Sequence, residues 1–256
     1  MKGFKPFDSF QRNGLHTPRG LGAGNGAGTG LAALPPMTQN PRLPLWLKLG
    51  YTAFMVVLVP CYWHLYGPTN FLYFCDLALF FTLAAVWTES SLLASMPAVG
   101  ILLPQAYWMV DFLSTAAGFP ISGLTNYMFD GNKPLFTRGL SFFHFWLPIL
   151  IVYLVAKLGY DRRALKAWAG FAFVVLLLCY FVLPAPPAPA DQPHLPVNVN
   201  YVHGLSDDRP QTWMHPHLYF LTVLAALPAL CYLPTHLILR RIFRPDLPAR
   251  GTIPTT

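Results

Sequence analysis

Six long apolar runs follow one another along the chain after Pro44. They cover residues 46–66, 70–87, 92–113, 140–157, 165–183 and 216–239. Each is about the length that a helix needs to cross a hydrocarbon core of about 30 Å, although the second run is short by this measure. Several runs contain proline, which membrane helices tolerate because neighbouring helices satisfy the freed backbone groups. The pattern predicts an all-α membrane protein with six transmembrane helices.

The segments on either side of these runs are different in character. Residues 1–43 are rich in glycine and proline and contain no apolar core, so we expect a disordered tail. No hydrophobic region follows the basic start, which argues against a signal peptide. The glycines of residues 20–30 are not followed by Gly-Lys-Ser/Thr, which argues against a phosphate-binding loop. The predicted domains are therefore a tail (1–43), a six-helix membrane domain (44–241) and a second tail (242–256).

Composition supports this interpretation and excludes other classes. Of the 256 residues, 54% are hydrophobic and 11% are charged, whereas soluble domains carry about 25% charged residues. The net charge of +7 does not indicate a nucleic-acid partner, because the basic residues lie at the ends of apolar runs and form no stripe. Membrane lipids are the expected partners. The four cysteines show no metal-binding spacing, so we expect neither a metal nor another cofactor. Nothing in the sequence indicates the oligomeric state.

The distribution of basic residues predicts the orientation of the chain. If the N-terminus is cytoplasmic, fourteen of the seventeen Lys and Arg residues lie on the cytoplasmic side. The three on the other side are Lys133, Arg138 and Arg209. Such an excess is the positive-inside pattern. We therefore expect both tails in the cytoplasm and two long external loops, 114–139 and 184–215.

A few polar residues interrupt the apolar runs. Cys75 and Asp76 follow the start of the second run, and an ionised Asp well inside a membrane helix costs roughly 2.5–3.5 kcal/mol, which makes such a residue a candidate for function. Asp111 lies near the external end of the third run and His144 about one turn into the fourth. All four lie at one depth in the predicted topology. We expect them to line a polar pocket below the external surface, while Glu89, at the other end, is expected to be a loop residue.

Further polar residues surround this predicted pocket. Gln105 and Trp108 lie two turns and one turn below Asp111 on the same helix face, and Ser141 stacks over His144. The second external loop adds three candidates for substrate contact, Asn200, Tyr201 and His203. Each of these residues also has a structural explanation, as a hydrogen-bonding group between helices or a residue at the membrane interface.

The order of several short motifs resembles the YwaF-type bacterial integral membrane proteins and their animal relatives, the transmembrane phospholipid acyltransferases. The resemblance covers about residues 70–240. It rests on five segments taken in order: Phe74-Cys75-Asp76-Leu77, Val99-Gly100-Ile-Leu-Leu-Pro-Gln105, Ser141-Phe-Phe-His144, Asn200-Tyr201 and Trp213-Met-His-Pro216.

The resemblance implies a lipid acyltransferase or hydrolase of the bacterial inner membrane that works through a thioester. Cys75 would be the nucleophile and His144 its base, with Asn200 and Tyr201 shaping the pocket. A thiolate needs a base within hydrogen-bond reach, so Cys75 and His144 can act together only if the second and fourth runs are neighbours. Asp76 or Asp111 could then orient His144 as the third member of a triad.

Three alternatives remain open at this stage. Asp76, Asp111, His64 and His144 could bind a cation or relay protons in a binding or transport protein. A metal-dependent enzyme would use His and Asp ligands, but His215 and His217, two residues apart, lack the i, i+4 spacing of helical metal ligands. In a structural membrane subunit, the buried polar groups would only hold helices together.

Overall fold

The structure, a computed structural model, describes residues 42–191 and 195–243, and within these ranges every regular element is helical. The predicted tails lie outside the described residues except at their inner margins. In chain order the elements are α1 (Leu45–Tyr66), the 3-10 turn η1 (Pro68–Leu72), α2 (Phe74–Thr88), α3 (Ser91–Ala116), the 3-10 turn η2 (Asn126–Met128), α4 (Leu135–Ser141), α5 (Phe143–Leu158), α6 (Ala164–Phe181), the 3-10 turn η3 (Val199–Tyr201), α7 (Pro216–Ala226), the π-helical segment η4 (Leu227–Tyr232) and α8 (Leu233–Ile242).

Five helical segments are long and apolar enough to cross a membrane, and this part of the prediction is confirmed. They are α1, α3, α4 with α5 (Leu135–Leu158), α6, and α7 with η4 and α8 (Pro216–Ile242). The second predicted run divides into η1 and α2, and α2 has only 15 residues. The fourth run contains a break between α4 and α5, and the sixth contains the π-helical segment η4 within a continuous helix. The apolar pattern did not predict either feature, because the residues there are as apolar as those around them.

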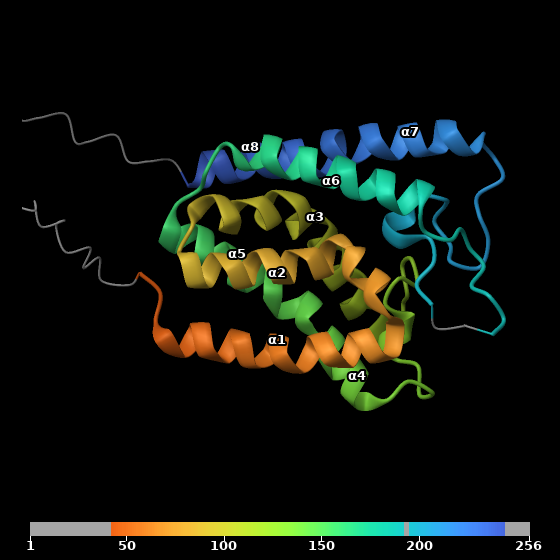
Figure 1. The fold of residues 1–256 in the computed structure, drawn as a ribbon, viewed down its shortest axis with the longest axis horizontal. Helices are drawn as coiled ribbons and strands as arrows, with labels where there is room; N and C mark the ends of the chain where they lie inside the picture. The colour runs from red at the N-terminus through yellow and green to blue at the C-terminus, as the bar shows by residue number, and fades with distance from the viewer. Residues whose placement is uncertain (1–41, 192–194, 244–256) are drawn as a thin grey trace, which may run out of the picture. The chain divides into compact units, whose positions relative to one another are not determined.

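Glycines end two of the helices. Gly67 follows α1 with φ 77° and Gly159 follows α5 with φ 90°, both in the region that L side chains rarely adopt. Gly159 N–H still donates to the Val155 carbonyl at 2.9 Å, which satisfies one of the last free carbonyls of α5. These turns reverse the chain, so that successive helices run in opposite directions (Figure 1).

Helix α3 is the centre of the packing. It contacts α2, α5, α6, η4 and α8, more partners than the helices around it have. Its first half buries small residues such as Ala94, Ser95, Ala98 and Gly100, and small side chains let neighbouring helices approach closely. At Gly100 this approach is extreme, since a Cβ built there would lie 1.9 Å from the Trp168 ring of α6.

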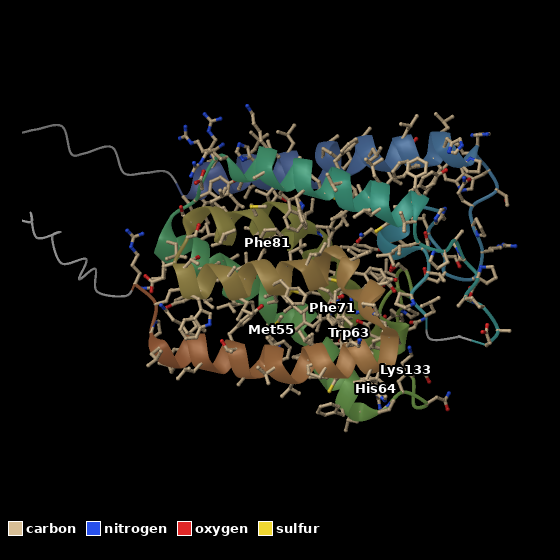
Figure 2. The ribbon with its side chains drawn as sticks, in the orientation of Figure 1. Met55, Trp63, His64, Phe71, Phe81 and Lys133 are labelled. Atoms are coloured by element: carbon tan, nitrogen blue, oxygen red, sulfur yellow. The ribbon has the colours of Figure 1, made fainter. Side chains whose placement is uncertain are left out.

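The two ends of the helices differ. Residues 42 and 243, where the described chain begins and ends, lie at one end, here called the terminal end (Figure 1). The long connections lie at the other, here called the loop end, over the described residues 117–134, 182–191 and 195–215. Trp63 and His64 of α1, Phe71 of η1 and Lys133 lie toward the loop end, whereas Met55 and Phe81 lie nearer the middle (Figure 2).

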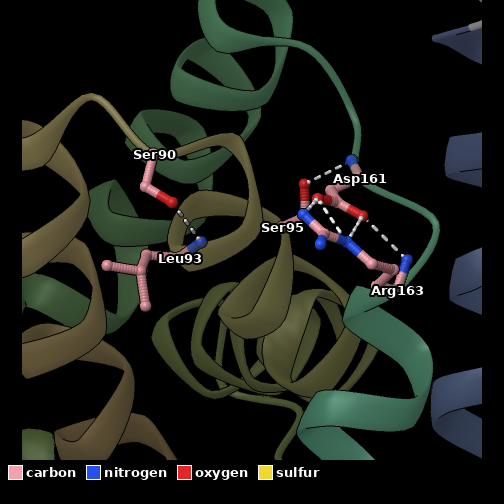
Figure 3. A network of polar contacts seen from close by, with 5 residues as sticks. All are labelled: Ser90, Leu93, Ser95, Asp161 and Arg163. Atoms are coloured by element: carbon pink, nitrogen blue, oxygen red, sulfur yellow. Dashed lines mark hydrogen bonds and ion pairs between the residues drawn. The ribbon is translucent and has the colours of Figure 1, made fainter.

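Polar contacts hold the terminal end together. Glu89, beyond the last residue of α2, accepts hydrogen bonds from the backbone of Arg42 and Leu43 and from Lys48 Nζ at 2.8 Å. It is a loop residue, as expected, but it also fixes the start of α1. Elsewhere at this end, Asp161 N–H donates to Ser95 Oγ of α3 at 3.0 Å, and Arg163 pairs with the Asp161 carboxylate (Figure 3).

Candidate functional site

The first turn of α2 is held from a distant part of the chain. Phe74 N–H, which has no partner within its own helix, donates to Asn200 Oδ1 at 3.0 Å. Asn200 Nδ2 in turn donates to the Leu72 carbonyl at 2.8 Å. Asn200 therefore acts as a helix cap across 126 residues of sequence, and it fixes the direction in which the next two residues, Cys75 and Asp76, project.

The loop that carries Asn200 has an unusual backbone. Asn198, Asn200 and Tyr201 all have positive φ, between 52° and 60°. Asparagine tolerates this conformation, whereas it is strained for a bulky residue such as tyrosine. Asn198 supports the turn by donating from Nδ2 to the carbonyls of Gly204 and Ser206, both at 3.0 Å, and by accepting from His203 N–H at 2.8 Å. The loop thus has a defined shape at the point where it meets α2.

Cys75 and Asp76 form the polar centre of the site. Cys75 Sγ lies 3.9 Å from Asp76 Oδ2, close enough for the thiol to donate, and Asn70 Nδ2 donates to the same oxygen at 3.3 Å. Asp76 is only 3% exposed. Its other oxygen, Oδ1, is buried and has no hydrogen-bond partner among the described residues. A buried carboxyl oxygen without a partner is rare in folded proteins and requires an explanation.

Three tyrosines lie within electrostatic range of this pair. Tyr127 of η2 and Tyr201 of η3 both interact electrostatically with Cys75, and Tyr62 of α1 interacts with Asp76. Burial raises the pKa of Tyr127 and of Tyr201, and the nearby Cys75 adds to both increases. Both phenols therefore stay neutral at physiological pH, in the form that donates a hydrogen bond.

His144 is held by its own helix and its neighbours. Its Nδ1 lies 2.7 Å from the Ser141 carbonyl, and the Ser141 hydroxyl lies 2.7 Å from Tyr62 Oη. Because a carbonyl can only accept, Nδ1 carries the proton and Nε2 is left with a lone pair in the neutral ring. The imidazole also stacks on Trp108, with ring centroids 5.0 Å apart. These contacts set both the orientation and the tautomer of the ring.

The structure places Cys75, Asp76, Gln105 and His144 at one level. Asp76 lies twelve residues from Thr88, and Gln105 and His144 each lie fourteen residues from the ends of their helices at the terminal end. At 1.5 Å per residue, all are about 18–21 Å from that end. The second and fourth predicted runs are neighbours, since α2 packs against α5. No hydrogen bond joins Cys75 to His144 within the described ranges, and the acid–base group beside the thiol is Asp76.

Gln105 and Trp108 occupy the α3 side of this level. Both are buried, at 4% and 5% exposure. Gln105 Oε1 has no hydrogen-bond partner in the described part of the chain, as Asp76 Oδ1 has none. Trp108 contacts His144 on one side and interacts with the Tyr127 hydroxyl on another. The α3 side thus adds a second unpartnered acceptor and an aromatic wall.

Asp111 has a different role from the one the sequence indicated. It is fully buried, and both of its oxygens are occupied. Oδ1 accepts from the backbone and hydroxyl of Ser122 at 2.8 and 2.9 Å, and Oδ2 accepts from the backbone and hydroxyl of Thr125 at 2.9 and 2.8 Å. A carboxylate with four donors from one loop anchors that loop. Asp111 fixes the connection that presents Tyr127.

His203 lies in the packing of α6 and α7. Its ring stacks on Tyr180 at 5.1 Å, and Tyr180 in turn bonds to His217 Nδ1 at 2.8 Å. Burial lowers the pKa of His203, which favours its neutral form. Its Nε2 is buried without a hydrogen-bond partner in the described residues. His203 supports the Asn198 loop through its backbone, and no described contact joins it to Cys75.

Four contributors were not singled out from sequence: Asn70, Tyr62, Tyr127 and Asn198. Tyr62 lies near the end of an apolar run, where aromatic residues are typical of the membrane interface, so the sequence pattern does not mark it as part of a site. The spacing Asn198-x-Asn200 in an apolar context was an available signal for the turn.

Over residues 42–191 and 195–243, no three His, Cys, Asp or Glu side chains are grouped to hold a metal ion. Comparisons with known protein families, curated proteins and solved structures find no match to this chain.

Proposed function

We propose that the chain crosses the membrane six times, with the terminal end in the cytoplasm. Within the described residues, basic side chains gather at the terminal end, at Arg42, Lys48, Lys157, Arg162, Arg163, Lys166, Arg240 and Arg241, against Lys133, Arg138 and Arg209 at the loop end. This asymmetry follows the positive-inside rule. The sixth crossing is α2 extended by η1, which runs between α1 and α3 in the opposite direction to both (Figure 1). The site around Cys75 then lies below the outer surface of a bacterial plasma membrane.

At that site we propose thiol-dependent acyl transfer on a membrane lipid, with Cys75 as the nucleophile. The observation that carries the proposal is the Cys75–Asp76 pair, with Sγ 3.9 Å from Oδ2, at the capped start of α2. A thiol becomes an effective nucleophile when a neighbouring base removes its proton. The resemblance of the motifs to lipid acyltransferases points to the same cysteine.

The chemistry is balanced with the groups at this site. Asp76 accepts the Cys75 proton, and Sγ forms a bond to the carbonyl carbon of a lipid ester. The ester C–O bond breaks, the lysolipid leaves as an alcohol with the proton returned by Asp76, and a thioester remains on Cys75. Water or the hydroxyl of a second lipid then attacks the thioester and releases the thiol.

Two further groups fit this reaction. The neutral hydroxyls of Tyr127 and Tyr201 lie within electrostatic range of Cys75, where they can donate to the oxygen that gains charge in the tetrahedral intermediate. His144, with the Nε2 lone pair free, is a second base for the incoming alcohol. The lipid tail would remain among the apolar side chains of the helices.

The decisive experiment detects the thioester. The purified protein is incubated in nanodiscs with a phospholipid that carries an alkyne-tagged acyl chain, and intact mass and hydroxylamine sensitivity are measured. Cys75→Ala is expected to abolish labelling. Cys61→Ala and Cys231→Ala are matched controls, because both cysteines are also partly buried in helices, and they are expected to retain it. Labelling that persists in Cys75→Ala, or its absence from the folded wild type, would refute acyl transfer at Cys75.

A second candidate function is the binding of a proton or cation at Asp76. The observation that favours it is the buried Oδ1 without a hydrogen-bond partner, since an incoming donor or ion would complete its coordination. Cys75→Ala separates the two functions, because it leaves the Asp76 carboxyl in place. Proton or cation uptake by proteoliposomes that survives Cys75→Ala and is lost in Asp76→Asn would establish this second function.

A further inference from the structure

An apolar groove opens between α1 and α5, away from the site around Cys75. Its volume is about 600 Å³. Its lining includes Trp46, Gly50, Tyr51 and Phe54 from α1 and Trp146 and Tyr153 from α5. The other lining residues are leucine and isoleucine, so the lining is apolar along its length. The lining therefore suits a flexible hydrocarbon chain.

The groove exists because aromatic rings, rather than close helix packing, bridge α1 and α5. Trp146 packs edge-on against Phe54 at 4.9 Å and against Tyr51 at 6.0 Å, which forms the floor. The Tyr51 hydroxyl is satisfied by the Leu79 carbonyl at 3.0 Å, so Tyr51 presents only its ring. Gly50 leaves the groove open, because nothing lies within 4 Å of a Cβ built there.

The mouth of the groove carries a positive charge. Trp46 and Gly50 belong to the first turns of α1, and Tyr153 lies five residues before the end of α5, so the groove reaches the terminal end. There Lys157 Nζ lies 5.9 Å from the centroid of the Tyr153 ring. Lys157 is exposed and forms no ion pair within the described residues, whereas Lys48, on the facing helix, is paired with Glu89. Trp46, 72% exposed, lies at the level where tryptophan favours lipid headgroups.

We propose that this groove binds one anionic phospholipid of the cytoplasmic leaflet. One acyl chain lies along Gly50 and Trp146, and the phosphate group contacts Lys157. Charge complementarity selects this occupant, because a groove that is apolar along its length and cationic at its mouth matches a lipid with a negative headgroup. The inference rests on the membrane orientation proposed above and is independent of the chemistry at Cys75.

The test is lipid retention measured by native mass spectrometry. The full chain is released from nanodiscs of equal parts phosphatidylglycerol and phosphatidylcholine, and the lipid that stays bound is identified. We expect one bound phosphatidylglycerol, preferred about fivefold over phosphatidylcholine, because one lysine near an anionic headgroup gives a preference of about this size. Gly50→Leu fills the groove and should abolish retention. Lys157→Gln should retain one lipid but lose the preference.

Matched controls come from α6. Gly170 is an exposed helical glycine with open space around its Cβ position, and Lys166 is an exposed lysine at the same end. Gly170→Leu and Lys166→Gln should both leave retention and preference unchanged. Helical circular dichroism in the same samples shows whether each variant is folded. Labelling of Cys75 shows separately whether the proposed enzyme is active, which separates failure of this inference from failure of the proposed enzyme.

Two results would overturn the inference. One is retention that is the same in folded Gly50→Leu as in wild type, or that shows no headgroup preference. The other is a dimer that dissociates in Gly50→Leu, which would show that a second copy of the chain fills the groove. A photoactivatable phosphatidylglycerol gives an independent readout, with cross-links expected at Trp146 and Tyr153.

Discussion

Asn200 and Phe74 are joined by a hydrogen bond of 3.0 Å, from the first free backbone N–H of α2 to the Asn200 side-chain oxygen. This bond connects the second long loop to the turn that carries Cys75 and Asp76. Any motion of the loop therefore moves the start of α2. The position of the proposed nucleophile therefore depends on the loop through one amide side chain.

Replacement of Asn200 by alanine should weaken this connection. We expect the free energy of unfolding to fall by about 0.5–2 kcal/mol, the usual effect of removing a helix cap, and to fall further because alanine is less tolerant of φ 60°. The apparent melting temperature in detergent should fall, and Cys75 should react faster with a maleimide. Asn132→Ala, which removes an exposed amide in the other long loop, is the control and should change neither. Unchanged maleimide kinetics in Asn200→Ala would contradict the role of the cap.

Gly100→Ala should be strongly destabilising. The added Cβ would lie 1.9 Å from the Trp168 ring, which is fully buried, so the ring or α6 must move. Overpacking of this kind costs about 1–3 kcal/mol. Urea denaturation in detergent and Trp fluorescence should both report the change. Gly170→Ala adds the same methyl group to open space and is expected to be neutral or slightly stabilising; an equal loss in both variants would rule out the steric explanation.

Asp111→Ala should release the first long connection. Four donors from Ser122 and Thr125 would lose their acceptor, and hydrogen bonds to a charged group are each worth about 1.5–3 kcal/mol. We expect faster hydrogen exchange and faster proteolysis across residues 117–134. Asp130→Ala is a matched control in the same connection, because among the described residues the Asp130 carboxylate accepts a hydrogen bond only from Asn132 N–H. If exchange rises equally in both variants, Asp111 does not anchor the loop.

The Lys48–Glu89 pair should make stability dependent on pH in the acid range. The hydrogen bond from Lys48 holds the pKa of Glu89 below its ordinary value. A carboxyl whose pKa is lowered by folding stabilises the protein above its unfolded pKa, near 4.3, and this stabilisation is lost as the pH falls through the lower folded value. Melting temperature should therefore drop between about pH 5 and pH 3.

Glu89→Gln tests this assignment. The variant should be less stable than wild type at pH 7 and should lose less stability on acidification, since glutamine does not titrate. Lys48→Met should show the same reduced response. A wild-type response to acid in both variants would assign the pH dependence to other groups.

The sequence by itself determined the helical membrane architecture, because the length and composition of an apolar run are local properties. It also located Cys75, Asp76 and His144 at one level, because the rise per residue of a helix is fixed. It did not determine which of these side chains contact one another or which distant segments they bind. Asp111, predicted to be a wall of the pocket, binds a loop instead, and Asn200 caps a helix 126 residues away. Such pairings depend on how helices rotate against one another and where long loops return. These are properties of the packed chain and leave no local pattern in the sequence.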